Sequence, residues 1–286
     1  MDKENLKKIG AFLVKNPFSS LFDPNPDNHP NIIYKYRNWR EEFHKNLILK
    51  NEIFLSSPNN LNDPFDCRIF SNYQKHINSI ENKKEFIKNS ISKNLRYLKE
   101  HKITTEEAEN ILNKRLEDTL KFQVRSEVIE REFNDKHIGV TCFSEVWNSI
   151  LMWSHYGDNH SGYCVGFDEK LIRYSQIGKL MRVNYSNEYP DLNPILKNKN
   201  SDEIKFFLKS TEWSYEREIR LISLYNESNP KRLINLDNDV IKEVIIGLNT
   251  SKKDKEEIVA IAKDKGIDVW QAVKGEFEFK IERYKL

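Results

Sequence analysis

The chain contains little cysteine, glycine or proline, and its acidic and basic residues nearly cancel. It is 286 residues long, with 3 Cys, 9 Gly and 9 Pro, and it carries 46 Lys and Arg against 44 Asp and Glu. This composition excludes collagen-like and Gly/Ser linker proteins, and an aromatic content of 12% with so small a net charge excludes a disordered chain. A net charge of +2 also provides no global field that would attract nucleic acid or an anionic membrane.

The cysteines and the apolar runs are equally sparse. Cys67, Cys142 and Cys164 lack the paired short spacings of a zinc site. An odd, scattered set argues against a disulfide framework and favours a reducing compartment. No stretch approaches the roughly 20 apolar residues of a membrane span, and the apolar patch at residues 11–14 is too short for the core of a signal peptide. We therefore expect a cytoplasmic protein without a membrane partner.

Changes in composition and in apolar spacing divide the chain into an N-terminal segment, a domain and an insertion within that domain. Residues 3–15 have the spacing of an amphipathic helix, and a proline-rich strap follows up to Pro30, so we assign residues 1–30 to an N-terminal helix and strap. Residues 31–286 are expected to form one domain. Within it, residues 73–133 lack Gly and Pro and have apolar residues at helical spacing, with a capping box at Thr104 and Glu107. We expect residues 73–135 to be an inserted helical hairpin that packs mainly on itself and on one edge of a sheet.

The remaining segments mix strands and helices without regular alternation. The patterns predict helices after residue 38 and over 147–157, 201–213 and 251–266, the last with Ser251 as N-cap and Gly266 as C-cap. The predicted strands cover residues 31–37, 52–57, 137–144, 161–167, 179–186, 217–225, 240–247, 268–272 and 276–284. This order favours an α+β fold with a mainly antiparallel sheet.

Four segments combine polar with aromatic residues and are the candidate sites: 34–37, 62–66, 142–162 and 213–220. In the first, Lys35 and Arg37 are either ligand-binding cations or the solvent face of an edge strand. In the second, Asp63 and Asp66 fit a plain Asx turn better than a calcium loop.

The third segment carries two histidines near Ser144. His155 and His160 do not have the four-residue spacing of a zinc helix, so we predict no metal there. A triad of Ser144, His155 and Asp158 lacks the Gly-x-Ser-x-Gly turn that exposes such a serine. The alternative is a histidine bonded to a backbone carbonyl within an aromatic core.

The fourth segment carries two carboxylates at the mouth of a predicted strand. Glu216 and Glu218 are two apart, so on a strand both project to the same side. They repel unless a cation is near, and one of them is expected to have a raised pKa. The alternative is a pair of surface salt bridges, with Arg220 as the partner of Glu218. Trp213 and Tyr215 beside them favour a partly apolar cleft.

At these segments the chain resembles a bacterial family catalogued as domain of unknown function 2971. The stretches that carry the resemblance are IIYKYR, FLSSPNNLNDPFDC, CFSE, LMWSHYGDNHSGYCVGF and WSYEREIRLIS. It spans roughly residues 31–225, apart from the helical insertion, and it implies no particular activity.

The order of an arginine, a strand ending in serine and Glu-x-Glu also resembles the arginine–serine–glutamate pattern of ADP-ribosyltransferases. That resemblance implies a split antiparallel sheet whose cleft holds NAD. Arg37 or Lys35 would hold a phosphate, and Ser144 would brace the nicotinamide ribose. Glu218 would be the catalytic glutamate, and Glu216 would assist the acceptor.

Together these arguments predict an NAD-dependent ADP-ribosyltransferase or NAD glycohydrolase of a bacterial defence or toxin-like system, acting on an unidentified protein or nucleic-acid acceptor. Aromatic rings would stack on nicotinamide or adenine. The predicted NAD-binding residues are Tyr34, Lys35, Tyr36, Arg37, Ser144, Trp153, His155 and Tyr156. One alternative is a metal-dependent nuclease that uses Asp63, Asp66, Glu216 and Glu218. The other is a module that binds a nucleotide without turning it over.

Overall fold

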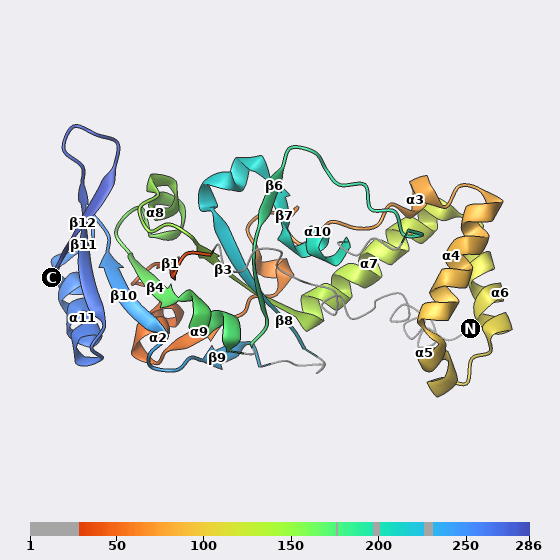
Figure 1. Ribbon diagram of the computed structural model, residues 1–286, viewed down its shortest axis with the longest axis horizontal. Coiled ribbons are helices and arrows are strands. Elements are labelled where there is room, and N and C mark those ends of the chain that lie inside the picture. Colours follow the sequence, from red (N-terminus) through yellow and green to blue (C-terminus); the bar gives the residue numbers. More distant parts are fainter. Residues whose placement is uncertain (1–28, 176, 197–200, 226–230) are drawn as a thin grey trace. The chain divides into compact units, whose positions relative to one another are not determined.

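The computed structural model describes residues 29–286, except 176, 197–200 and 226–230 (Figure 1). The predicted helix over residues 3–15 and most of the strap lie outside the described residues. The chain divides into two compact units. Among the described residues, one, the helical unit, contains Leu61–His137 and Glu188–Leu208. The other, the sheet unit, contains residues 29–60 together with Ile138–Asn187 and Lys209–Leu286. The predicted insertion lies entirely within the helical unit.

The sheet unit is built on one eight-stranded sheet in the order β12-β11-β10-β4-β1-β3-β8-β5 (Figure 1). Its strands are β1 (Ile32–Arg37), β3 (Ile138–Ser144), β4 (Tyr163–Asp168), β5 (Lys179–Arg182), β8 (Glu218–Leu224), β10 (Ile241–Ile246), β11 (Asp268–Lys274) and β12 (Ile281–Lys285). Only β10 and β11 pair in parallel, and every other pair in this sheet is antiparallel. The shorter strands are β2 (Glu52–Phe54), β6 (Asn184–Ser186), β7 (Leu208–Ser210) and β9 (Leu233–Asn235). The predicted α+β class with a mostly antiparallel sheet is confirmed.

The helices of the sheet unit are α2 (Glu42–Leu49), α8 (Ile150–Tyr156), α9 (Glu169–Tyr174) and α11 (Lys252–Asp264), with the 3-10 helices η2 (Pro58–Asn60) and η3 (Thr211–Glu216). Those of the helical unit are α3 (Tyr73–His76), α4 (Ile80–Lys93), α5 (Leu95–Glu100), α6 (Thr105–Arg115), α7 (Thr119–His137) and α10 (Ser201–Phe207). Residues 73–137 therefore form a series of five helices rather than the predicted hairpin. Three local predictions are confirmed: the Thr104–Glu107 capping box, the Ser251 N-cap and the left-handed Gly266 at the end of α11.

Several predicted elements are shorter than their patterns indicated, and for two of them the local cause is clear. The helix predicted over 201–213 ends at Phe207, because Ser210 caps a separate 3-10 helix by accepting a bond from the Glu212 amide. The strand predicted over 276–284 begins only at Ile281, because Phe277 has a left-handed backbone in the preceding turn.

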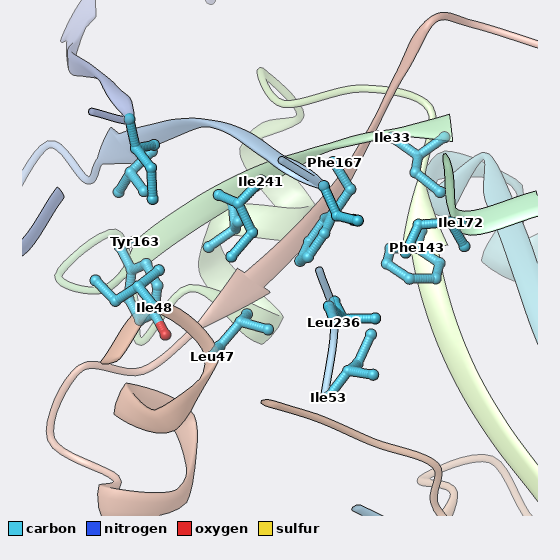
Figure 2. Packing of buried hydrophobic residues seen from close by; sticks show 14 of the residues in the cluster. Ile33, Leu47, Ile48, Ile53, Phe143, Tyr163, Phe167, Ile172, Leu236 and Ile241 are labelled. Carbon is cyan, nitrogen blue, oxygen red and sulfur yellow. The ribbon is translucent and has the colours of Figure 1, made fainter. Parts of the chain in front are cut away.

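Alternation along β1 divides the sheet unit into two cores. Ile33 faces a large aliphatic core that includes Phe143, Phe167 and Ile241 (Figure 2). Tyr34 and Tyr36 face the other side, where they pack with residues such as Met152, Trp153 and Ile245. Both faces of the central strands are therefore covered, and a side chain's place on the strand decides which core it enters.

The helical unit has an apolar core of its own. Tyr73, Phe86 and Phe122 meet edge to face, with ring centroids 5.1 to 5.9 Å apart. Leu112 and Ile195 are buried in the same cluster. Across the described residues, no helix combines the length and the apolar character needed to cross a membrane.

Gly162 stands at the start of β4, where two backbone segments meet too closely for a side chain. A Cβ atom there would collide with the carbonyl oxygen of Arg37. The Gly162 carbonyl accepts bonds from the Gly247 amide at 3.0 Å and the Thr250 hydroxyl at 2.9 Å. The close approach at Gly162 therefore fixes the first residues of β4 against β1, and the two hydrogen bonds fix them against the loop after β10.

We expect Gly162→Ala to lower the free energy of unfolding by about 2 kcal/mol, because the methyl group forces the backbone of β1 away. Urea unfolding followed by circular dichroism measures the change. Gly275→Ala is the control, since its nearest neighbour, the Lys280 Cβ atom, lies at 3.2 Å and belongs to a surface hairpin. An equal effect at both positions would contradict a rigid contact at Gly162.

Candidate functional site

Three predicted site residues lie in one row across adjacent strands. Tyr34 of β1 pairs with Ser144 of β3, and Ser144 in turn pairs with Glu218 of β8. Residues directly opposite each other in antiparallel strands project to the same face. The strands predicted to form the site are therefore neighbours, although they are far apart in the sequence.

The Tyr34–Ser144 pair is the whole of the register between β1 and β3. Beyond it the strands part, and Val140 of β3 pairs with Ser56 instead. Lys35 occupies the place where they separate, and its Nζ donates to the Cys142 carbonyl at 2.7 Å. Lys35 therefore satisfies a carbonyl that the departure of β1 leaves without a ladder partner.

Two predictions about the basic residues are corrected by this register. The arginine–serine–glutamate resemblance implies one cleft that holds both Arg37 and Ser144, but Lys35 and Arg37 leave β1 on the side opposite to Tyr34, so Arg37 and Ser144 do not share a face. The edge-strand alternative is also wrong, because β1 lies between β4 and β3 and Lys35 is only 6% exposed. Of the two cations, Lys35 is the one that forms a hydrogen bond to β3, at the Cys142 carbonyl.

The two carboxylates belong to a buried network of four charges. Arg220 donates to both oxygens of Glu218, from Nε at 2.7 Å and from a terminal nitrogen at 2.9 Å. Lys209 donates to Glu216 at 2.7 Å and lies 3.6 Å from Glu218. All four residues are buried. Lys209 is therefore the cation that the two neighbouring glutamates require. The predicted pairing of Glu218 with Arg220 is also present, but it is buried and does not lie on the surface.

The two glutamates have opposite pKa shifts. Burial raises the pKa of Glu216, and the Glu218 charge adds to this although Lys209 opposes it. Burial also disfavours the charged form of Glu218, but Arg220 and Lys209 outweigh it and hold that pKa at about 2. Glu218 is thus a permanent anion at neutral pH, and Glu216 accepts a proton more readily.

Hydrogen bonds tie Ser144 and two aromatic residues to this network. The Ser144 hydroxyl donates to the Glu216 carbonyl at 2.6 Å, and the Tyr156 hydroxyl donates to the Glu216 carboxylate at 2.6 Å. His155 is exposed, and its Nδ1 lies 2.9 Å from the Tyr215 hydroxyl. The structure therefore gathers Ser144, Tyr156, Glu216 and Glu218 in one place, with His155 at its surface.

The predicted stacking role of three aromatic residues is corrected. Trp153 is fully buried, and its Nε1 donates to the Trp147 carbonyl at 2.7 Å. Tyr36 packs edge to face on Trp153, and its hydroxyl donates to the Val146 carbonyl at 2.8 Å. Tyr34 donates to Glu243 at 3.0 Å. These rings are core residues, whereas Trp213 and Tyr215 are among the aromatic residues of this region that are partly exposed.

The other motifs have structural roles. Asp63 accepts a hydrogen bond from the Phe65 amide at 2.9 Å. This is the Asx turn that the sequence predicts for residues 62–66 in preference to a calcium loop. Ser144 and His155 are each bonded to other partners, so they do not form a triad with Asp158. In the part of the chain that the structure describes, no group of three or more His, Cys, Asp or Glu side chains is placed to hold a metal ion.

Sequence reasoning missed Lys209, the centre of the network. The signal was a single lysine in the otherwise apolar run FFLKS, shortly before the two glutamates. A cation in such a run is usually buried against a carboxylate, so the pairing was within reach of the sequence. The Tyr34–Glu243 contact spans 209 positions and carries no local signal.

Comparison with known proteins gives one match. Neither a curated protein nor a solved structure matches the chain. Residues 152–221 match the model of the family described as "Protein of unknown function (DUF2971)". This segment contains Tyr156, Lys209, Glu216, Glu218 and Arg220, and so the complete charge network. Over residues 152–221, the family resemblance that the sequence motifs indicated is confirmed.

Proposed function

We propose that the sheet unit cleaves the bond between nicotinamide and ribose in NAD, and passes ADP-ribose to a macromolecular acceptor or to water. The observation that carries the proposal is the row formed by Tyr34, Ser144 and Glu218 across three strands. The serine lies directly beside the glutamate, which supports two of the three members of the arginine–serine–glutamate pattern.

The charge state of the glutamates suits this reaction. When nicotinamide leaves with the electron pair of its bond, positive charge develops on the ribose, and a fixed carboxylate stabilises it. Glu218 is such a carboxylate because its pKa is about 2. The incoming hydroxyl or water must lose a proton, and Glu216, with its raised pKa, is the better acceptor.

A partly exposed group of aromatic side chains next to the charge network could contact the rings of a bound nucleotide. Trp213 lies 4.6 Å from the Lys209 ammonium, and Tyr215 bonds to the exposed His155. We assign stacking on nicotinamide or adenine to this group rather than to the buried rings. Lys35 and Arg37, to which the resemblance assigns a phosphate, project from the opposite side of β1 and so do not complete this row.

The test is incubation of the purified chain with NAD labelled in the adenosine part, without added metal. Release of nicotinamide supports the proposal when the label appears either in free ADP-ribose, the product of hydrolysis, or on a macromolecular acceptor. Binding of NAD without turnover would identify the non-enzymatic module. Turnover of nucleic acid that requires Mg²⁺, without cleavage of NAD, would identify the nuclease.

Glu218→Gln should reduce NAD turnover by a factor of about 100 or more, the usual loss when a preorganised electrostatic group is removed. It also breaks a buried ion pair, so we expect the free energy of unfolding to fall by about 3 kcal/mol. Turnover is therefore measured per folded molecule, at a temperature where circular dichroism shows the variant to be folded.

Glu169→Gln is the matched control, because it makes the same substitution at another buried carboxylate, which pairs with Arg173 rather than with the network. It should cost similar stability and keep turnover per folded molecule. If both variants lose turnover equally, the loss comes from breaking a buried ion pair, and the catalytic assignment fails.

Glu216→Gln should slow the step that consumes the ADP-ribosyl group more than the release of nicotinamide. The amide cannot accept the proton, but it still bonds to Tyr156 and Lys209. The pH profile is the measurement: the wild-type rate should rise with pH through the raised pKa of Glu216, and the variant should lose this limb. The control is Glu145→Gln, which changes a carboxylate paired with Arg182 and Arg217 at the surface. If the rate of Glu216→Gln still rose with pH as in the wild type, the role of Glu216 as proton acceptor would be contradicted.

A further inference from the structure

The turn between β11 and β12 carries two fully exposed phenylalanines. Phe277 and Phe279 are 99% and 102% exposed, and the next most exposed large apolar residue that the structure describes, Phe43, reaches 79%. Phe277 also has a left-handed backbone, with φ at 57°, which glycine adopts freely and a bulky residue adopts only with strain. Figure 1 shows this turn extending beyond the strands. Two such rings so close together indicate a surface that a partner covers.

The strand that follows this turn has an open edge. β12 is the last strand of the sheet, and among the described residues it pairs with β11 alone, in an unbroken register. The Gly275 amide donates to the Lys280 carbonyl at 2.8 Å. Bonded pairs in an antiparallel ladder recur at every second residue, so the even-numbered residues of β12 bond to β11. The main-chain groups of Ile281, Arg283 and Lys285 therefore face the outer edge, where another strand could pair.

The charges on β12 favour a second copy of the same strand as that partner. When two such edges pair antiparallel about a two-fold axis, one outward-bonding residue lies opposite its own copy. With Ile281 at the axis, Lys280 of each copy lies opposite Glu282 of the other. With Arg283 at the axis, two arginines lie opposite each other, which is unfavourable. Charge complementarity therefore selects the register centred on Ile281.

Lys280 and Glu282 already form an ion pair within one copy, at 2.7 Å. Both side chains remain about half exposed, at 51% and 48%, so each can face a second charge. Pairing two copies about Ile281 places the two ion pairs side by side with opposite charges adjacent. The result is a square of four alternating charges, which is favourable on a sheet surface.

The same register brings the turn of each copy against the last residues of β12 in the other copy. Tyr284 is 50% exposed there, and the aliphatic stems of Arg283 and Lys285 add apolar surface beside it. Phe277 and Phe279 of one copy therefore meet a ring and two aliphatic stems in the other.

The area that the rings would bury is close to what a stable dimer requires. A buried aromatic side chain contributes about 150–250 Å², so the four phenylalanines of two copies contribute about 600–1,000 Å². A specific interface buries about 1,200–2,000 Å² in total, and the paired edges with Tyr284 supply the remainder. Since the pairing uses the β12 edge of both copies, it closes at two.

We propose that the chain forms a two-fold dimer in which two β12 strands pair antiparallel about Ile281. The phenylalanines of each turn are buried against β12 of the other copy, and the two large sheets continue into one. The dimer makes no use of NAD chemistry, so its test is independent of the proposed function.

Sedimentation velocity of the full chain over a wide range of concentration is the first test, and we expect a reversible monomer–dimer equilibrium. Replacing both rings, Phe277→Ser with Phe279→Ser, should raise the dissociation constant about a hundredfold, because buried aromatic residues dominate such interfaces. The melting temperature of the monomer should not fall, since the rings are fully exposed within one copy. Phe43→Ser, at an exposed phenylalanine of α2, is the matched control and should leave the dissociation constant unchanged.

Charge reversal tests the register. Lys280→Glu and Glu282→Lys should each raise the dissociation constant about tenfold, because like charges then lie opposite each other twice in the dimer. Mixing the two variants should restore association near the wild-type level, as a dimer with one copy of each. Mixing cannot restore the ion pair within either copy, so the recovery reports a contact between copies. Lys121→Glu and Asp118→Lys reverse an exposed pair of the helical unit, and both should associate as the wild type does.

Several results would overturn the dimer. These are a monomer at every concentration, a dimer that the double phenylalanine variant leaves intact, and charge variants that do not recover on mixing. A monomeric chain that sediments with phosphatidylcholine vesicles, and loses this binding in the double phenylalanine variant, would assign the rings to a membrane surface instead of a second copy.

Discussion

One residue pair holds the two halves of the large sheet together. Tyr34 and Ser144 are the register between β1 and β3, with β4, β10, β11 and β12 on one side and β8 and β5 on the other. Sheets normally tolerate no unpaired interior edge, because each free carbonyl costs desolvation energy. Here the gap is closed by Ser56 at Val140 and by the Lys35 ammonium at Cys142. Ser56 and Lys35 therefore complete the backbone bonding of β3 where the sheet separates.

This separation also divides the charges. On the side of Tyr34 and Ser144, two glutamates meet Lys209 and Arg220, so the buried network is neutral overall. A neutral network with bidentate geometry is stable in the interior, and it fixes the ionised form of Glu218. On the other side of β1, Lys35 and Arg37 have no such balance. The two sides of β1 therefore differ in charge balance, and among the described residues only the side of Tyr34 and Ser144 carries a network in which each carboxylate meets a cation.

The sequence predicted most of this fold because its signals are local. The strands β1, β3, β4, β8 and β10 and the caps of α6 and α11 follow from patterns within a few residues. Glu216 and Glu218 both lie near Lys209, but not as two residues of one strand: Glu216 ends the 3-10 helix η3, and Arg217 has a left-handed backbone before β8 begins. Local patterns do not determine how strands order in a sheet, so the face of Arg37 could not be derived. For the same reason Trp153 and Tyr36 looked like ligand contacts, although they pack against each other in a core.

The family match adds a constraint to the interpretation of the network. It covers residues 152–221 and therefore includes the glutamates and both of their cations, but neither Ser144 nor β1. Ser144 of β3 bonds to the backbone of Glu216, and Lys35 of β1 bonds to the Cys142 carbonyl of β3. Both residues lie outside the matched segment, yet they contact it or adjoin it through β3. The proposed chemistry thus depends on how β1 and β3 complete the network that the matched segment carries.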